Sequence, residues 1–318
     1  MTVPTNLITG FLGVGKTTAV LDLLARKAAG SRWAVLVNEY GEVGVDGALI
    51  DGAAPAGVTV REVGGGCVCC ASAPYLGVAL HFLLIDAKPD RLLIETTGLG
   101  HPARLIDTLR ASYRGRLDVR ATLGLIDPAD FAQPAMRANP IFREQVELAD
   151  VLVLNKLDAA GPALVAEFQA WANDLDPPKL LVAATERGRI DEAWLDLEAD
   201  RAPPSRPRQG SEPQAARTAP TPDGAGSGVP HARGWTFPPD VVFDRDRVVA
   251  LLAAPGLVRA KGVFRTPYEW YAVNRARTSA PTVTPTAYRR DSRVEAFADA
   301  PDWAAFEREL RAAILPPR

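Results

Sequence analysis

The chain has 318 residues, of which 47% are hydrophobic, and its 36 Lys and Arg against 38 Asp and Glu give a formal net charge of −2. This length favours two domains, and a charge this close to zero excludes the strong field that draws a protein to nucleic acid or to an anionic membrane. No apolar run approaches the roughly 20 residues of a membrane span, and the N-terminus lacks a signal-peptide pattern, so we expect a cytoplasmic protein.

Residues 1–198 alternate short β-branched apolar runs with helix-like segments, which is typical of βα units on a mostly parallel sheet. The predicted strands cover residues 6–9, 33–38, 58–63, 91–96, 117–127, 151–155 and 180–184. Apolar residues at helical spacing predict helices at 16–28 and 163–175, both packed on the sheet. This part of the sequence therefore predicts an α/β domain.

A phosphate-binding loop follows the first predicted strand. Residues 10–18 fit G-x-x-x-x-G-K-[ST] and open a predicted helix, which is the context that identifies a P-loop. Backbone N–H groups of such a loop turn toward phosphates, Lys16 reaches the terminal phosphates as a catalytic residue, and Thr17 offers its hydroxyl to Mg²⁺. The predicted nucleotide-binding residues of this P-loop NTPase element are Gly10, Gly13, Val14, Gly15, Lys16, Thr17 and Thr18.

The loop after the second predicted strand, residues 38–46, carries three acids and two glycines. Such a loop suits a switch that orders around a nucleotide and its magnesium ion. We expect Glu42 to be catalytic and Asp46 to bind the cofactor. Each acid on its own could equally be a solvated loop carboxylate, and their clustering favours the switch.

Three cysteines, Cys67, Cys69 and Cys70, follow three glycines just after the third predicted strand. Three thiolates suit a soft or borderline ion such as Zn²⁺ or Cu(I), and a site with only three protein ligands keeps a coordination position open for ligand exchange. The alternatives are small buried hydrophobic residues or thiol redox chemistry. An odd number of cysteines argues against a disulfide framework.

The fourth predicted strand ends in Glu95 and Thr96, and Thr97 and Gly98 follow. A carboxylate at this position holds magnesium or orients the attacking water in P-loop enzymes, so Glu95 is the first catalytic candidate. Gly98 would let the backbone approach the γ-phosphate and is predicted to bind the cofactor.

A base-reading motif, Asn155, Lys156 and Asp158, begins at the last residue of the sixth predicted strand. A carboxylate here accepts hydrogen bonds from the N1–H and the exocyclic amine of guanine, whereas adenine has no donor at position 1. The motif therefore favours GTP over ATP, although Asp158 could instead simply cap a helix.

Residues 199–233 are rich in Pro, Arg, Ser, Gly and Ala and predict a linker. Apolar residues return in 234–318, where we expect a smaller α+β domain. Its predicted helices lie at 246–252 and 302–314, and its strands lie near 257–264, 268–273 and 293–297.

Taken together, GFLGVGKTT, NEYGEVGVD, GGCVCC, ETTGL and NKLD, in this order, resemble the CobW-like family of metallochaperone GTPases. The likeness continues through residues 259–263 and 293–295. It implies GTP and Mg²⁺ as cofactors, metal binding at the cysteine motif, and a C-terminal interaction module. Zinc is the metal that the family most often implies, with cobalt or iron also within its range. The histidine-rich stretch of many members is absent here, where the linker region holds only His231.

We therefore expect a GTPase that hydrolyses GTP to GDP and phosphate and couples this reaction to the transfer of a metal to a client protein. The protein could form a homo-oligomer, and we expect no nucleic-acid or membrane partner. An alternative is a regulatory GTP-binding module whose cysteines sense oxidation or bind zinc structurally. A third, a small-molecule kinase, is disfavoured by the base-reading motif.

Overall fold

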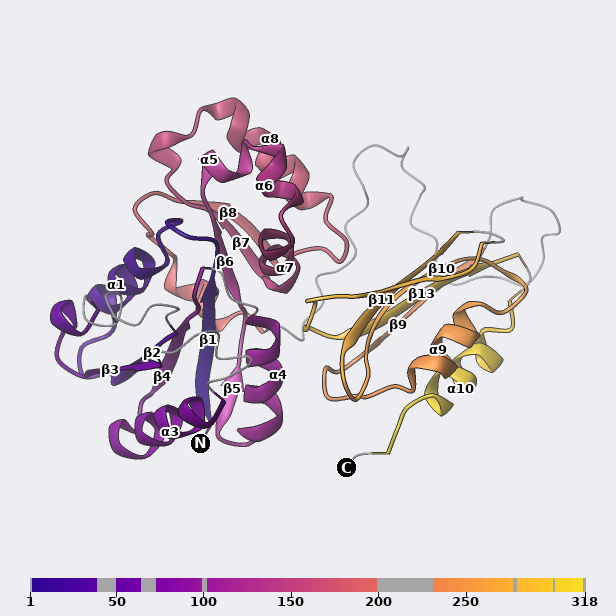
Figure 1. Cartoon of the computed structure of the whole chain (residues 1–318), viewed down its shortest axis with the longest axis horizontal. Helices are drawn as coiled ribbons and strands as arrows, with labels where there is room; N and C mark the ends of the chain where they lie inside the picture. Colours follow the sequence, from indigo (N-terminus) through magenta and orange to yellow (C-terminus); the bar gives the residue numbers. More distant parts are fainter. Residues whose placement is uncertain are drawn as a thin grey trace. The chain divides into compact units, whose positions relative to one another are not determined.

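The computed structural model describes residues 2–38, 50–63, 73–98, 102–198, 231–276, 279–299 and 301–316. The chain divides into two compact units, Met1–Arg201 with Ala287–Arg290 and Ala202–Thr286 with Asp291–Arg318, and each contains its own sheet (Figure 1). Most of the predicted linker, residues 199–230, lies outside the described residues. The exact domain boundaries stay a prediction.

The first unit is built on a parallel sheet. Its strands pair in the order β3-β2-β4-β1-β6-β7-β8, with β5 also beside β1, and every pairing is parallel. The apolar runs of β2, β4, β6 and β7 are buried throughout because helices cover both faces of the sheet. The strands are β1 Val3–Thr9, β2 Trp33–Asn38, β3 Val58–Val63, β4 Arg91–Glu95, β5 Leu117–Val119, β6 Leu123–Ile126, β7 Val151–Leu154 and β8 Leu181–Ala184.

Two apolar cores lie on opposite faces of this sheet. Val20 and Leu23 of α1 pack with Ile8 on one face, whereas α3 and α4 pack with Leu7 and Leu36 on the other. Alternate strand residues point to opposite faces, so neighbours Leu7 and Ile8 enter different cores. The helical segments are α1 Lys16–Arg26, α3 Ala73–Phe82, η1 Leu83–Ala87, α4 Pro102–Ser112, α5 Pro128–Phe131, α6 Pro134–Ala138, α7 Pro140–Leu148, η2 Leu157–Ala159, α8 Pro162–Asn173 and η3 Glu192–Asp196.

The single strand predicted at 117–127 is wrong, because β5 and β6 are separate strands. Between them the backbone turns to other partners: the Ala121 N–H donates to the Leu197 carbonyl, and the Asn6 amide donates to the Ala121 carbonyl. These bonds replace the strand ladder at that point. The other predicted strands and helices of this unit are confirmed, with ends shifted by a few residues.

Four residues from late in the sequence, Ala287–Arg290, belong to the first unit. Ala287 joins the core beneath α3 and α4, and Arg289 forms an ion pair with Asp107 of α4 at 2.9 Å. Arg290 donates to the Pro178 carbonyl over 2.8 Å.

The second unit is an antiparallel sheet with two helices. The strand order is β12-β11-β10-β13-β9, and the sheet's apolar face packs against both helices, where Trp235 stacks on Phe306 with ring centroids 4.8 Å apart. This unit is the smaller α+β domain that the sequence predicts. Two of its strands, β9 and β12, were not predicted, and β9 begins at His231, within the expected linker. The elements are β9 His231–Phe237, α9 Arg245–Leu252, β10 Leu257–Arg265, β11 Trp270–Ala276, β12 Thr282–Pro285, β13 Ser292–Ala298 and α10 Trp303–Ala312.

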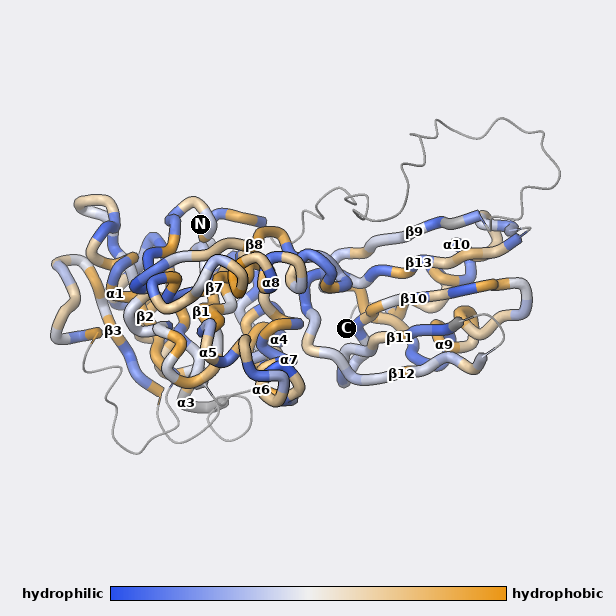
Figure 2. Tube along the Cα trace, turned by 90° about the horizontal axis from the view of Figure 1, so that it is seen from above, coloured by the Kyte–Doolittle hydropathy of each residue, from blue (hydrophilic) through white to orange (hydrophobic). Residues whose placement is uncertain are grey.

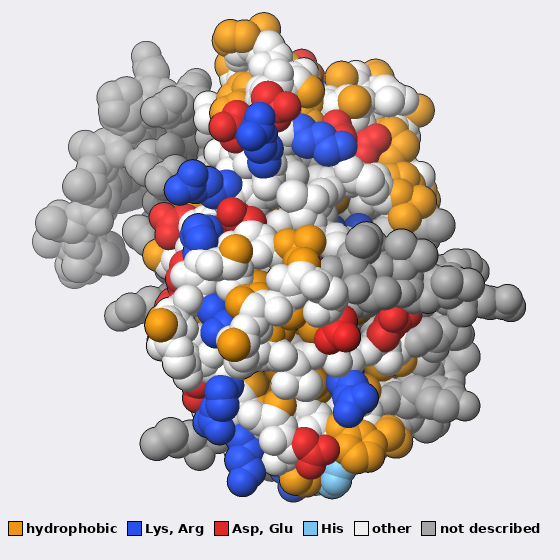
Figure 3. Space-filling model, turned by 90° about the vertical axis from the view of Figure 1, so that its left-hand side faces the viewer, with side chains coloured by type: hydrophobic (Ala, Val, Ile, Leu, Met, Phe, Trp, Pro, Cys, Tyr) orange, Lys and Arg blue, Asp and Glu red, His pale blue; other side chains and the backbone are white. Residues whose placement is uncertain are grey.

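Hydropathy follows this architecture. Orange, the hydrophobic end of the scale, gathers on the inner strands of the first unit (Figure 2). On the face drawn in Figure 3 the described acidic and basic side chains are interspersed rather than gathered by sign. No helix within the described ranges combines the length and apolarity needed to cross a bilayer.

Candidate functional site

The phosphate loop connects the end of β1 to the first residue of α1, as the sequence predicts. Its three glycines, Gly10, Gly13 and Gly15, all have positive φ angles, of 143°, 74° and 97°. Two of them also have no room for a side chain, because a Cβ would lie 2.4 Å from the Leu125 carbonyl oxygen at Gly10 and 2.5 Å from Asn155 Nδ2 at Gly15. Glycine is therefore required here by both conformation and packing.

Lys16 lies at the start of α1 and is 8% exposed. Its ammonium donates to the carbonyls of Gly10 and Phe11 over 3.0 and 2.9 Å. No acidic residue occupies the first turn of α1, so the positive end of the helix dipole is not neutralised there. Lys16 and the helix terminus together make this loop attractive to an anion. Val14 is buried in the loop, while Thr18 is exposed on the first turn.

Thr17 and Glu95 meet beside the loop. The Thr17 hydroxyl donates to Glu95 Oε1 over 2.7 Å, and Glu95, the last residue of β4, is 2% exposed. Parallel pairing places Glu95 opposite Ile8 of β1 and Val37 of β2. A hydroxyl and a carboxylate are hard oxygen donors, so this pair fits Mg²⁺.

The residues after Glu95 lie against the phosphate loop. The Thr96 hydroxyl donates to the Thr9 hydroxyl over 3.0 Å, and the Thr96 N–H donates to the Ile8 carbonyl over 3.1 Å. A Cβ on Gly98 would lie 2.8 Å from the backbone nitrogen of Leu12. On its other side, the Gly98 carbonyl accepts a hydrogen bond from Gln145 Nε2 over 3.1 Å. Gly98 is thus enclosed between the phosphate loop and α7.

Asn155, which follows β7, joins two loops. It is 2% exposed; its Nδ2 donates to the Val14 carbonyl over 2.9 Å, and its Oδ1 accepts from the Gly188 N–H over 2.9 Å. The Gly188 loop follows β8 and packs on the first turn of α1, since a Cβ on Gly188 would lie 2.7 Å from the Ala19 nitrogen. In this structure Asn155 therefore stabilises the phosphate loop.

Lys156 and Asp158 lie at the same edge of the sheet. Lys156 adopts a φ of 54°, and its ammonium pairs with Asp127 Oδ2 at 2.6 Å. Asp158 is exposed on η2, which leaves its carboxylate accessible. Burial, followed by the neighbouring Asp127 charge, raises the pKa of Asp130 above its ordinary value. A Lys156–Asp127 pair beside an accessible carboxylate leaves a polar edge on which a base could lie.

Glu42, Asp46, Cys67, Cys69 and Cys70 lie outside the described residues. The strands that lead into their loops are described: β2 ends at Asn38 and β3 at Val63, and these two residues are register partners in the parallel ladder. Both loops therefore leave the sheet at adjacent positions, on the edge that also carries Glu95. Among the residues that the structure does describe, no group of three or more His, Cys, Asp or Glu side chains is placed to hold a metal ion.

Three residues that our sequence reasoning missed belong to this site: Asp127, Gln145 and Gly188. Asp127 carried a usable signal, because a carboxylate directly after a buried parallel strand lies at the edge where ligands bind. Gln145 and Gly188 gave none. Each acts through a backbone contact that forms only in the folded chain.

Two family profiles match this chain. The profile described as CobW/HypB/UreG, nucleotide-binding domain, matches residues 4–182. The profile of the cobalamin synthesis protein cobW C-terminal domain matches residues 232–314. The first covers the parallel-sheet unit with all of the loops above, and the second covers the antiparallel unit.

Curated relatives agree with these matches. The zinc chaperone YeiR of Escherichia coli is 38% identical over 321 residues, covering 96% of both chains. The zinc chaperone YjiA of Escherichia coli is 37% identical over 167 residues, covering 50% of each chain. A zinc-bound crystal structure of the YjiA GTPase from E. coli covers 98% of this chain and 99% of its own, with 18% identity and a TM-score of 0.46.

Proposed function

Because the chain belongs to the CobW/HypB/UreG family of nucleotide-binding proteins, we propose that it is a cytoplasmic GTPase that holds a metal ion, zinc first, and delivers it to a metal-requiring client protein. The single observation that carries the nucleotide part of the proposal is the 2.7 Å contact between Thr17 Oγ1 and Glu95 Oε1 beside the phosphate loop, because this hydroxyl and this carboxylate are oxygen ligands of the kind that Mg²⁺ prefers. The names of the relatives as zinc chaperones support the choice of metal.

Hydrolysis would begin with GTP phosphates in the loop. Lys16 would exchange the carbonyls of Gly10 and Phe11 for phosphate oxygens, and the loop N–H groups with the α1 dipole would hold the remaining charge. Thr17 and Glu95 would hold Mg²⁺, which neutralises phosphate charge when bound. A water oxygen would then form a bond to the γ-phosphorus while the bond to the bridging oxygen breaks. One proton of the water would pass to a phosphate oxygen or to solvent, and GDP and inorganic phosphate would leave.

Guanine selection would depend on Asp158. Its exposed carboxylate can accept from N1–H and from the exocyclic amine, while Lys156 stays beside Asp127. Asn155 contributes indirectly, because it holds the phosphate loop in register with this edge.

The metal would bind at Cys67, Cys69 and Cys70, with an open position for transfer and with cobalt or iron as alternatives to zinc. Coupling to the nucleotide is supported by the sheet: the loop with Glu42 and Asp46 follows β2, the cysteine loop follows β3, and these strands are neighbours. A nucleotide that orders the first loop would change the surroundings of the second.

The experiment is a zinc competition titration against a chromogenic chelator, with GDP or a non-hydrolysable GTP analogue bound. Allosteric coupling of the usual size predicts zinc affinities that differ roughly 5- to 150-fold between the two states, and GTP affinity must change by the same factor when zinc binds. Changing all three cysteines to serine should abolish high-affinity zinc binding while GTP hydrolysis without zinc persists.

Equal zinc affinities in the two nucleotide states would contradict nucleotide-driven delivery. A triple serine variant that unfolds, with zinc binding independent of nucleotide, would favour the regulatory module with structural cysteines. The Lys16→Ala variant is the matched control, because it keeps the cysteines and should lose the nucleotide effect.

A further inference from the structure

We propose that Gln145 of α7 is a positioning residue for GTP hydrolysis, because its buried amide fixes the carbonyl of Gly98 in the loop expected to face the terminal phosphate. The inference rests on the proposed function and concerns the same site. Gln145 would not touch the nucleotide and acts only through Gly98.

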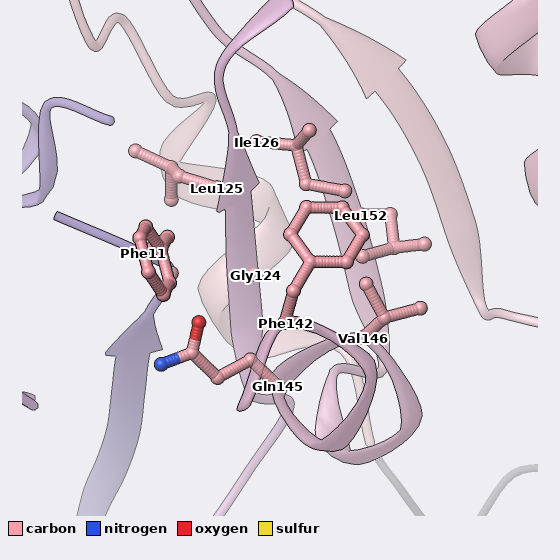
Figure 4. Close-up of a pocket in the computed structure, with 9 residues that line it drawn as sticks. Phe11, Gly124, Leu125, Ile126, Phe142, Gln145, Val146 and Leu152 are labelled. Atoms are coloured by element: carbon pink, nitrogen blue, oxygen red, sulfur yellow. The ribbon is translucent and has the colours of Figure 1, made fainter. Parts of the chain in front are cut away.

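The contact between them is buried. Gln145 is 3% exposed, and its Nε2 donates to the Gly98 carbonyl over 3.1 Å. Figure 4 shows the Gln145 amide directed toward Phe11 of the phosphate loop, away from the apolar side chains of Phe142 and Val146 on the same helix. An amide withdrawn from water in this way is held by its hydrogen bond, because breaking it would leave both polar groups without compensation.

Gly98 needs such a restraint. Glycine has the widest backbone freedom of any residue, so a loop that relies on it gains no order from its own side chain. Leu12 limits Gly98 from one side, with its nitrogen 2.8 Å and its Cδ2 2.7 Å from the place a Cβ would take. The Gln145 hydrogen bond limits Gly98 from the other side, so the two contacts together fix its position.

The close approach of α7 to β6 brings Gln145 within reach. A Cβ on Gly124 would lie 2.7 Å from Ala149 Cβ and 3.8 Å from the Gln145 carbonyl oxygen. The absence of a side chain at Gly124 therefore lets the end of α7 lie directly on the strand. Gly10 and Phe11 line the same small pocket as Gly124 and Gln145, which brings the phosphate loop, β6 and α7 together.

Both ends of α7 are anchored, so Gln145 stands on a fixed support. At the start, the Asn139 side chain caps the helix by accepting from the Ile141 N–H over 2.9 Å. At the end, the Lys179 ammonium donates to the carbonyls of Glu147 and Ala149 over 3.2 and 2.8 Å, and to that of Val146. A donor on an anchored helix holds its acceptor more firmly than one on a loop.

The test compares three variants of the full chain. Gln145→Met keeps the length of the side chain but removes the donor, and Gln145→Glu keeps the shape but turns a carboxylate toward the Gly98 carbonyl. Phe142→Leu is the matched control, since Phe142 is a buried residue of the same helix and pocket whose apolar side chain has no donor to offer the Gly98 carbonyl. For each we would measure kcat for GTP, the Kd for a fluorescent GDP and the Tm.

We expect Gln145→Met to lower kcat by about tenfold, equivalent to about 1.4 kcal/mol, with the Kd for GDP within about twofold of wild type. Gln145→Glu should lower kcat further, and Phe142→Leu should lower the Tm without this fall in kcat. The carbonyl ¹³C resonance of Gly98 should shift in both Gln145 variants and stay in place in Phe142→Leu.

Unchanged kcat in Gln145→Met, or an equal loss in Phe142→Leu, would overturn the inference while leaving the proposed function intact. A wild-type protein that hydrolyses no GTP would instead contradict the proposed function. The Gly98 carbonyl resonance would then still test the contact without any hydrolysis: if it does not shift in the Gln145 variants, Gln145 does not position Gly98. If Gln145→Glu fails to fold, Gln145→Met gives the same decision.

Discussion

Asn155 Nδ2 donates to the Val14 carbonyl over 2.9 Å, so the residue that opens the base-reading motif is bonded to the phosphate loop. The two residues are 141 positions apart in the sequence. The phosphate loop and the predicted base-reading motif therefore share one buried side chain. Since the same amide also accepts from the Gly188 N–H, Asn155 joins the ends of β1, β7 and β8.

Asn155→Ala should weaken GTP and GDP by similar factors, because both nucleotides use the phosphate loop that Asn155 supports. Leaving two buried backbone groups without this partner should also lower the free energy of unfolding by about 2 to 4 kcal/mol. Fluorescent-nucleotide titration and denaturant unfolding measure the two effects. Asn274→Ala, at an exposed position of β11, is the matched control. A loss confined to GTP would contradict this role.

Asp158→Asn should weaken GTP and improve xanthosine triphosphate, because the amide can donate to the 2-oxo group of xanthine. Competition binding with both nucleotides measures the change in preference. Asp174→Asn, at the exposed C-terminal end of α8, should leave the preference as in wild type. Wild-type protein that binds ATP as tightly as GTP would refute the assignment.

Gly98→Ala should lower kcat by at least about tenfold, because the new methyl group would lie 2.7 Å from Leu12 Cδ2 and 2.8 Å from Leu12 N, so the loop must move. GDP affinity should change less, since GDP lacks the phosphate that this loop is expected to face. Gly52→Ala is the control, because nothing lies within 4 Å of its added methyl group. Equal kcat in the two variants would mean that Gly98 tolerates displacement.

Lys179 should make stability depend on pH. The residue as a whole is partly buried, but carbonyls enclose its ammonium, and desolvation lowers its pKa from 10.5 to about 7, against the opposing effect of Asp150. Arg290 adds to the lowering, and Glu147 opposes it.

Between these two pKa values the unfolded chain binds more protons at this site than the folded chain does, so the folded state loses stability as pH falls. The free energy of unfolding of wild type, minus that of Lys179→Met, should therefore decrease as pH falls from about 10 to 7. Urea unfolding of both proteins at several pH values measures this difference. A difference that is flat across the range would show that Lys179 titrates normally.

The local elements of this protein could be predicted from its amino-acid sequence alone. The phosphate loop could be placed because its glycines, Lys16 and Thr17 are contiguous and lie between a strand and a helix, so their spacing fixes their geometry. The strands with long apolar runs were equally readable, since burial on both faces leaves an unbroken hydrophobic signal. Family likeness followed from the order of five such short motifs.

The strand predicted at 117–127 failed for a different reason. Its hydrophobic pattern runs on through Ala121, but the backbone there bonds to Leu197 and Asn6, which are distant in the sequence. Local hydrophobic periodicity does not depend on such distant partners, so it predicted one continuous strand where the structure has β5 and β6.

The groups that support the site could be identified only in the folded chain. Gln145 reaches Gly98 across 47 residues and Asn155 reaches Val14 across 141, and both contacts end on a backbone carbonyl. Every residue carries that acceptor, so no side-chain pattern in the sequence marks the one that is used. Packing determines which carbonyl is used. Because Gly124 has no side chain, α7 can lie close to the sheet, and because Gly15 has none, there is space for the Asn155 amide. The two hydrogen bonds form at these close approaches.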